Sequence, residues 1–166
     1  NTIVWEKDNP NVTTSYNLYK ESTFAGVYQL IANIPIADSS FYVDPVSNPQ
    51  IRSWRYKLTA LDSCGNESGM SVEHKTIHLT INLGIGGAIN LIWDHYEGIP
   101  VNTYNVHRYY PSSGWDTLAS LPGNLTTYTD TPSTLTDLFY QITVDHPDGC
   151  FPGKMGGDHH SSRSNT

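Results

Sequence analysis

Short stretches of alternating apolar and polar residues run along the whole chain and predict β-strands. The clearest stretch is residues 53–61, where Trp54, Tyr56, Leu58 and Ala60 alternate with polar residues, as on a strand with one face toward a core. Turn residues separate such stretches at intervals of roughly 8–12 residues, which is typical of a β-sandwich. No helical period extends over roughly 12 residues anywhere in the sequence. The pattern therefore predicts an all-β chain.

The same alternation predicts the strands individually. In the first half, strands are expected at residues 2–6, 16–21, 27–33, 40–43, 53–61 and 70–75. In the second half, they are expected at residues 76–82, 88–94, 103–109, 115–120, 126–129 and 137–145, with a final strand within 159–166. Nothing before Trp5 corresponds to the strand at 76–82. We therefore expect the first domain to lack its N-terminal strand and the chain to be a fragment of a larger protein.

The sequence contains two copies of one pattern. The matched pairs are Trp5 and Trp93, Tyr16 and Tyr104, Asp44 and Asp130, and Tyr56 and Tyr140, with offsets of 88, 88, 86 and 84 residues. A long period with a small drift indicates two copies of one domain with loops of slightly different length. The sequence therefore predicts two domains, residues 1–75 and 76–166, joined without a Gly/Ser-rich or Pro-rich linker.

Large apolar residues at matched positions are expected to form the two cores. Eleven Tyr and four Trp against two Met indicate a β-rich protein, and small domains must bury their few large side chains well. The predicted core residues are Trp5, Tyr16, Tyr56, Leu58, Trp93, Tyr104, Tyr140 and Ile142. Trp5 and Trp93 could instead stack on a ligand, but their place in a strand among aliphatic residues favours the core.

Composition and charge exclude several classes of partner. The formal net charge is −7, and the nine Lys and Arg residues are scattered rather than clustered. Nucleic acid and anionic membrane surfaces are therefore not expected partners. No apolar run approaches the roughly 18–20 residues of a membrane span. The first residues lack the basic start of a signal peptide.

A set of strand motifs resembles a known family. In the first copy the set consists of Trp5, the strand Tyr16–Tyr19, and the strand Tyr56–Asp62 running into Gly65–Ser68. It resembles the fibronectin type III domain, and the resemblance implies two tandem seven-strand immunoglobulin-like sandwiches.

The second copy carries most of the same motifs. It has Trp93, the strand Tyr104–His107 and the strand Tyr140–Asp145. It departs from the family pattern where His146–Cys150 replaces the Gly-Asn-x-Ser turn. The departure concerns the last loop and the last strand.

The resemblance is closer to one subset of the family. The segments Ile3–Lys7, Arg55–Lys57, His74–Asn82, Leu91–Asp94 and Ser162–Asn165 look like paired repeats in large secreted proteins of Bacteroidetes-type bacteria. This resemblance implies a secreted or cell-surface, outer-membrane-associated protein with a type IX secretion sorting domain beyond the last residue. It also implies a stalk or adhesion-like role, with flanking domains of the same polypeptide as partners.

An aromatic segment is the best candidate for a ligand site. Tyr109, Tyr110 and Trp115 are expected at the tip of one hairpin, where the first copy has only Phe24 and Tyr28 nearby. Such rings could stack on sugars or anchor a protein partner. The alternative is that Tyr109 and Trp115 fold back and cover the edge of the sandwich.

No metal, cofactor or catalytic residue is predicted. His74 and His78 would lie about 13 Å apart on a strand, too far to share one ion. The loop Asp62–Glu67 offers oxygen ligands for Ca²⁺, but a turn held by its own Asp and Asn side chains is expected instead. His159 and His160 have no nearby Cys. Ser, His and Asp occur without a nucleophile-elbow sequence, so an enzyme is not expected.

The two cysteines lie at matching places in the copies. Cys64 and Cys150 would be about a domain length apart, whereas a disulfide needs Cα atoms within about 7 Å. We expect no bond between them: either each is free, or Cys64 pairs with a residue upstream of Asn1.

These observations lead to three hypotheses about function. The first is a non-catalytic structural spacer or adhesion-like module of a larger secreted or surface protein. The second is a module that binds carbohydrate or protein through the aromatic hairpin. The third is an accessory domain of a secreted hydrolase.

Overall fold

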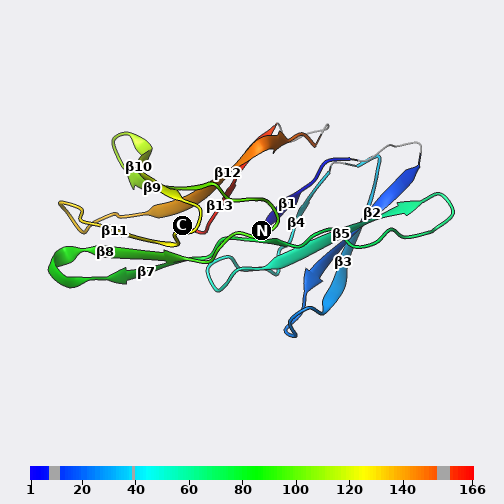
Figure 1. Cartoon of the computed structure of the whole chain (residues 1–166), viewed down its shortest axis with the longest axis horizontal. Helices are drawn as coiled ribbons and strands as arrows, with labels where there is room; N and C mark the ends of the chain where they lie inside the picture. The colour runs from blue at the N-terminus through cyan, green and yellow to red at the C-terminus, as the bar shows by residue number, and fades with distance from the viewer. Residues whose placement is uncertain (8–11, 39, 153–157) are drawn as a thin grey trace. The chain divides into compact units, whose positions relative to one another are not determined.

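The computed structural model describes residues 1–7, 12–38, 40–152 and 158–166. This part of the chain consists of antiparallel β-strands and one short 3₁₀ turn, Ile85–Gly87 (Figure 1). The prediction of an all-β chain is confirmed. Among the described residues, no helix has the length and apolar character needed to cross a membrane.

The chain forms two compact units. The first comprises Asn1–Asn48, Trp54–Lys75 and Pro147–His160, and the second comprises Pro49–Ser53, Thr76–His146 and Ser161–Thr166. Residues 49–53 thus belong to the second unit and residues 147–160 to the first. No pattern in the sequence predicts the placement of these two segments.

The first unit has six strands in the described part of the chain. They are β1 (Thr2–Val4), β2 (Thr13–Glu21), β3 (Tyr28–Pro35), β4 (Phe41–Val43), β5 (Arg55–Asp62) and β6 (His74–Lys75). Strands β1 and β4 form a two-strand sheet, and the other four form a sheet in the order β3-β2-β5-β6.

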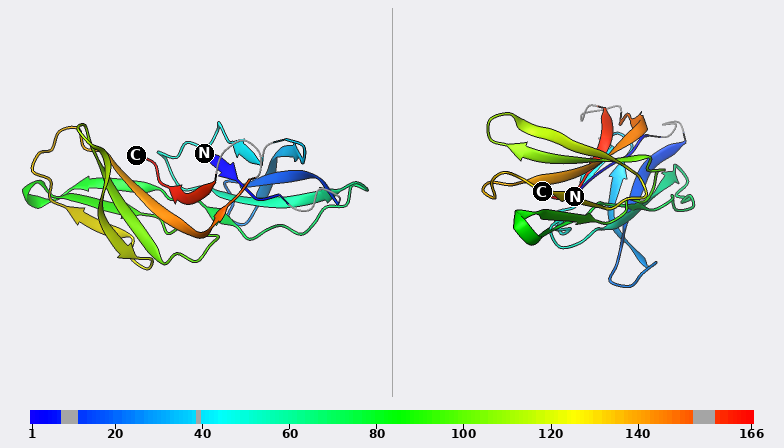
Figure 2. Two further views of the ribbon diagram at one scale, coloured as in Figure 1. Left: turned by 90° about the horizontal axis from the view of Figure 1, so that it is seen from above. Right: turned by 60° about the vertical axis from the view of Figure 1, so that its left-hand side comes forward.

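The second unit is built on seven strands. They are β7 (Leu79–Leu83), β8 (Ile89–Trp93), β9 (Thr103–Tyr110), β10 (Gly114–Pro122), β11 (Thr127–Asp130), β12 (Tyr140–Cys150) and β13 (His159–Arg163), although residues 147–150 of β12 and 159–160 of β13 belong to the first unit. The seven strands form a three-strand sheet, β11-β8-β7, and a four-strand sheet, β10-β9-β12-β13, which are two separate layers in Figure 2. This is the seven-strand sandwich that the resemblance to fibronectin type III domains implies.

Each unit has its own core around a tryptophan and a tyrosine in contact. Trp5 meets Tyr16 edge to face at 5.8 Å between ring centroids, and Trp93 meets Tyr104 at 5.6 Å. The buried residues of the first core are Trp5, Tyr16, Leu18, Ile34 and Tyr56. Those of the second are Ile77, Leu79, Ile89, Leu91, Trp93, Tyr96, Tyr104, Val106, Tyr140, Ile142 and Val144.

One predicted core residue is less buried than expected. Leu58 is only half-buried and packs against the first core, whereas the other seven predicted core residues are buried. The facing sheet offers a reason, because β1 and β4 have only three residues each and cover less of the four-strand sheet. The first core is accordingly smaller than the second.

The predicted strand at residues 70–75 is shorter in the structure, because serine hydroxyls replace part of the ladder. Ser71 Oγ accepts the Leu58 N–H at 3.0 Å, and Ser68 Oγ accepts the Ala60 N–H at 2.9 Å. The Ser71 and Ser68 N–H groups in turn donate to the carbonyls of Leu58 and Ala60. Side chains that bond the backbone in this way compete with regular pairing, so β6 is left with two residues.

Candidate functional site

The outer face of the four-strand sheet in the second unit carries the candidate site. Side chains alternate along β9: Tyr104 and Val106 point into the core, so Asn105, His107 and Tyr109 lie on the opposite face. On β12, Ile142 and Val144 are buried, which places their neighbours on the same outer face.

An aromatic row on this face runs from β10 across β9 to the residue that precedes β12. Trp115 pairs with Tyr109 across β10 and β9, and their rings meet at 5.6 Å and 66°. The Tyr109 N–H donates to the carbonyl of Phe139, and these two rings meet at 6.2 Å and 79°. Trp115 is 44% exposed and Phe139 is 49% exposed. We call Trp115, Tyr109 and Phe139 the aromatic row.

Polar side chains continue the face beyond the aromatic row. His107 Nε2 lies 2.9 Å from Thr143 Oγ1, and His107 Nδ1 lies 3.0 Å from Thr117 Oγ1. Burial, with a contribution from the charge of Arg163, lowers the pKa of His107 below its usual value of 6.5. The imidazole is therefore neutral at pH 7, with one nitrogen as donor and one as acceptor.

Next to His107 on this face, the amide of Asn105 is hydrogen-bonded to the hydroxyl of Ser120 and to the carboxylate of Asp145. Asn105 Nδ2 donates to Asp145 Oδ2 at 3.0 Å, and Ser120 Oγ donates to Asn105 Oδ1 at 2.6 Å. We call Asn105, His107, Thr117, Ser120 and Thr143 the polar rows. Amide, hydroxyl and imidazole groups can each donate and accept hydrogen bonds without a formal charge.

Tyr110 lies on the opposite face from Tyr109 and Trp115, so the three residues of the predicted ligand site do not share one face. The guanidinium of Arg108 lies over the Tyr110 ring at 4.6 Å from its centroid, and Arg108 Nη2 donates to the Tyr110 hydroxyl. Adjacent residues of a strand point to opposite faces, so Tyr109 and Tyr110 are separated. Phe139 takes the third place; it directly precedes β12, and nothing in the sequence shows that it lies beside Tyr109.

A buried ionic cluster joins the two sheets of the first unit. Asp44 follows β4 and is 2% exposed. Its Oδ2 accepts hydrogen bonds from Lys20 Nζ at 2.9 Å and from the Tyr56 hydroxyl at 3.0 Å, and Ser47 Oγ also donates to it. Lys20 and Tyr56 lie opposite each other on β2 and β5.

The pKa values reflect this cluster. Burial opposes ionisation of Asp44, but hydrogen bonds from Ser47, Lys20, the Val46 N–H and Tyr56 outweigh it and lower its pKa to about 2. Burial raises the pKa of Tyr56 to about 12. At neutral pH the cluster is therefore an ionised pair with a neutral phenol.

The second unit has the same cluster at the matched positions. Asp130 Oδ2 accepts hydrogen bonds from Arg108 Nη1 at 2.5 Å and from the Tyr140 hydroxyl at 2.7 Å. Arg108 and Tyr140 are opposite each other on β9 and β12, and Asp130 ends β11 in the other sheet. Burial raises the pKa of Tyr140. The repeat offsets in the sequence indicate that the two clusters are equivalent, because each member of one cluster matches a member of the other.

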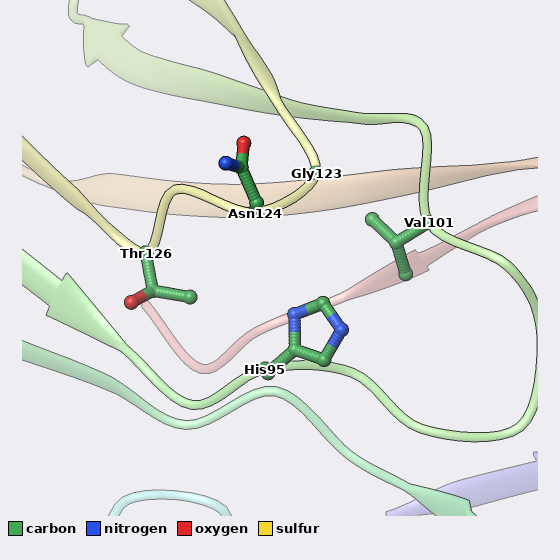
Figure 3. Close-up of a pocket in the computed structure, with 5 residues that line it drawn as sticks. All are labelled: His95, Val101, Gly123, Asn124 and Thr126. Carbon is green, nitrogen blue, oxygen red and sulfur yellow. The ribbon is translucent and has the colours of Figure 1, made fainter.

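A hollow of about 500 Å³ lies elsewhere on the second unit. It is lined by His95, Val101, Gly123, Asn124 and Thr126 (Figure 3). His95 Nδ1 is 2.9 Å from the Tyr104 hydroxyl, which also accepts the Tyr96 N–H. These lining residues include no carboxylate or ammonium group; the polar side chains are an imidazole, an amide and a hydroxyl.

The remaining positions considered for metal binding or disulfide formation form no such site among the described residues. Asp62 Oδ1 accepts the N–H groups of Cys64 and Asn66 at 2.8 Å, so the Asp62 turn is held by its own side chain. Within the described residues, no group of three or more His, Cys, Asp or Glu side chains is placed to hold a metal ion. Cys64 is an exposed free thiol, and Cys150 is a half-buried free thiol.

Comparisons with known proteins add little. No family model matches the chain, and no curated protein matches it. Among solved structures, it is similar to a crystal structure of the chicken CNTN1 FN1-FN3 domains, with 12% sequence identity and a TM-score of 0.36. The match covers 87% of this chain and 55% of that chain. We draw nothing from so weak a likeness, and the sandwich fold stands on the sheets and cores described above.

Proposed function

We propose that the chain is a non-catalytic structural module, a spacer of adhesion type within a larger secreted or cell-surface protein. The observation that supports it best is the repeated cluster of a cation, a carboxylate and a phenol. Lys20, Asp44 and Tyr56 in one unit have Arg108, Asp130 and Tyr140 as counterparts in the other. Both copies thus use their buried ionic groups in the same way, to tie one sheet to the other.

These groups have little capacity left for chemistry. A nucleophile or general base needs a free, oriented partner within hydrogen-bond reach of a substrate. In both clusters the carboxylate is already bonded to a cation and a phenol inside the sandwich. A buried pair that loses one partner is strongly destabilised, so retaining both clusters favours a role in holding shape.

The location and partners are proposed from the resemblance stated for the sequence. Paired repeats of this type imply a secreted or surface protein of Bacteroidetes-type bacteria, in which the neighbouring domains of the same polypeptide are the direct partners. The scattered basic residues and the net charge of −7 also argue against nucleic acid as a partner.

Single-molecule pulling on the chain between its two termini tests the spacer role. We expect two separate unfolding events, each releasing roughly 25–30 nm, because about 75–90 residues extend by up to ~3.4 Å each. Asp44→Asn should lower the force of one event and Asp130→Asn that of the other. Asp38→Asn, at an exposed position, is the matched control. Extension without discrete events, or equal forces in all variants, would contradict the proposal.

A further inference from the structure

The two units carry different side chains at the same place on the outer sheet face. The positions of Tyr109, Trp115 and Phe139 in the second unit correspond to Glu21, Tyr28 and Arg55 in the first; Glu21 pairs with Tyr28 just as Tyr109 pairs with Trp115. In the first unit this row is ionic, with Arg55 Nη1 3.3 Å from Glu21 Oε2. The fold therefore does not require aromatic side chains at this place.

The polar groups next to the row also differ between the units. In the first unit, Asn17, Tyr19 and Thr59 all donate to a single oxygen of Glu67, at 3.0, 2.6 and 2.5 Å. These hydrogen bonds lower the pKa of Glu67 to about 2, so the carboxylate is anionic and holds the donors. On the first face, the anionic carboxylate of Glu67 thus binds the neighbouring hydrogen-bond donors.

In the second unit the corresponding groups are joined mainly by neutral side chains. His107 lies between the hydroxyls of Thr117 and Thr143, and Asn105 accepts from Ser120. An Asn amide and a hydroxyl each retain further donor or acceptor capacity after one or two such bonds. The charges that act on His107 are of both signs, Arg163 against Asp145 and Asp116. The face therefore combines exposed rings with mainly neutral hydrogen-bonding groups, beside the exposed carboxylate of Asp145.

We propose that the outer face of β10, β9 and β12 binds a neutral oligosaccharide. The exposed rings of Trp115 and Phe139 lie against the apolar faces of sugar rings, and the polar rows, with the exposed Thr117 and Ser120 foremost, bond the hydroxyls. This combination of apolar surface and a few placed polar groups is the usual composition of a small-ligand site. The proposal is independent of the spacer role, which concerns the buried clusters.

The dimensions of the face favour a sugar chain over a protein partner. Three neighbouring strands span about 10 Å, and three rows of side chains along them span about 13 Å. A stable protein interface buries about 800 Å² on each partner around a well-packed apolar centre. Here the apolar part is a single row of three side chains, and the remainder is polar. A narrow, flat and mostly neutral surface suits an extended oligosaccharide.

Binding of the intact 166-residue chain to a printed array of neutral and acidic oligosaccharides tests the proposal, followed by titration with the best neutral oligosaccharide. Trp115→Ala and Phe139→Ala should each weaken binding about tenfold, the usual effect of truncating an anchoring aromatic residue. Trp115→Phe and Phe139→Tyr should restore most of it. Phe24→Ala, at an exposed aromatic residue of the first unit, is the matched control and should bind like the wild type.

Because Trp115 and Phe139 are about half exposed, the alanine variants should keep their fold, and near-ultraviolet circular dichroism of each variant checks this. The titration also follows the fluorescence of the four tryptophans, which should shift on binding in the wild type and in Phe24→Ala but not in Trp115→Ala. Absence of binding to every neutral oligosaccharide would overturn the proposal. So would equal affinity of the wild type and Trp115→Ala, binding of acidic oligosaccharides alone, or capture of a protein through this face without any sugar binding.

Discussion

At the scale of single residues, some matched positions of the repeat carry side chains of similar chemistry in both units, and others carry different side chains. Lys20, Asp44 and Tyr56 are repeated in chemistry, as Arg108, Asp130 and Tyr140. Others are repeated only in place, since Arg55 has Phe139 as its counterpart. The sequence offsets reveal which residues match, but not which of them touch. Phe139 could not be assigned to the site because its neighbours come from the pairing of β9 with β12.

The free energy of unfolding of the first unit should fall at acid pH as Asp44 becomes protonated. Its pKa is about 2 in the folded protein against an ordinary value of 3.8, so its contribution is complete above about pH 4 and disappears as the pH falls toward 2. The expected loss in the free energy of unfolding is about 2 kcal/mol. Hydrogen exchange of β2 and β5 amides from pH 5 to pH 2 measures it. Asp44→Asn should lack this part of the pH dependence; an identical profile would contradict the assignment.

The second unit should depend on Asp130 in a similar way. Asp130→Asn leaves the Arg108 guanidinium, with a side chain only 14% exposed, without its carboxylate. We expect the free energy of unfolding of this unit to fall by about 2–4 kcal/mol, because a buried charge loses its partner. Urea unfolding followed through the amide signals of β9 and β12 measures the change. Asp116→Asn, at an exposed position, should stay within about 0.5 kcal/mol of the wild type.

At the scale of elements, alternation in the sequence locates the strands but not how they end. It predicts a strand at 103–109, and β9 is Thr103–Tyr110. It also predicts a strand at 70–75, where only His74–Lys75 pairs regularly. Serine is compatible with a strand, and nothing in its spacing indicates that its hydroxyl will accept a backbone N–H instead. A local sequence pattern also does not predict contacts between a turn and a segment distant in the sequence.

The turn between β10 and β11 provides a test of such a contact. A Cβ at Gly123 would lie 1.8 Å from the carbonyl oxygen of Val101, so Gly123→Ala forces the backbone apart. We expect a loss of at least about 1–3 kcal/mol, the usual cost of overpacking. Gly69→Ala has no heavy atom within 4 Å of its new Cβ and serves as the control. Equal urea midpoints for the two variants would show that the turn adjusts freely.

At the scale of the whole molecule, one fold appears twice with different surfaces. The two-sandwich plan follows from alternation, turn spacing and the long repeat, because these depend on residues close in sequence. The candidate face cannot be predicted from such local patterns, because it forms only when β10, β9 and β12 lie side by side. The copies therefore act as controls for each other, since a side chain can be exchanged between equivalent positions on the same scaffold.

Transfer of the aromatic row between units should transfer sugar binding. In a chain carrying Trp115→Ala and Phe139→Ala, the further changes Glu21→Tyr and Arg55→Phe rebuild the row beside Tyr28. Replacing both Glu21 and Arg55 leaves neither of these charges alone, and Glu73, the second partner of Arg55 at 4.0 Å, keeps Lys57 at 3.9 Å. We expect part of the affinity for the neutral oligosaccharide to return, measured by the same titration. The same chain with Glu21→Gln and Arg55→Gln is the control, and equal weak binding by both chains would contradict the transfer.

The serine hydroxyls beside β5 have a consequence for a chain that carries two similar units. Two units joined in one polypeptide meet often while the chain folds, and a free strand edge could join the wrong unit and start aggregation. Ser68 and Ser71 already occupy the amides of Ala60 and Leu58, and Ser164 does the same for the matched Ile142. An intruding strand would first have to break these bonds, so each copy is protected against misassembly with its own relatives.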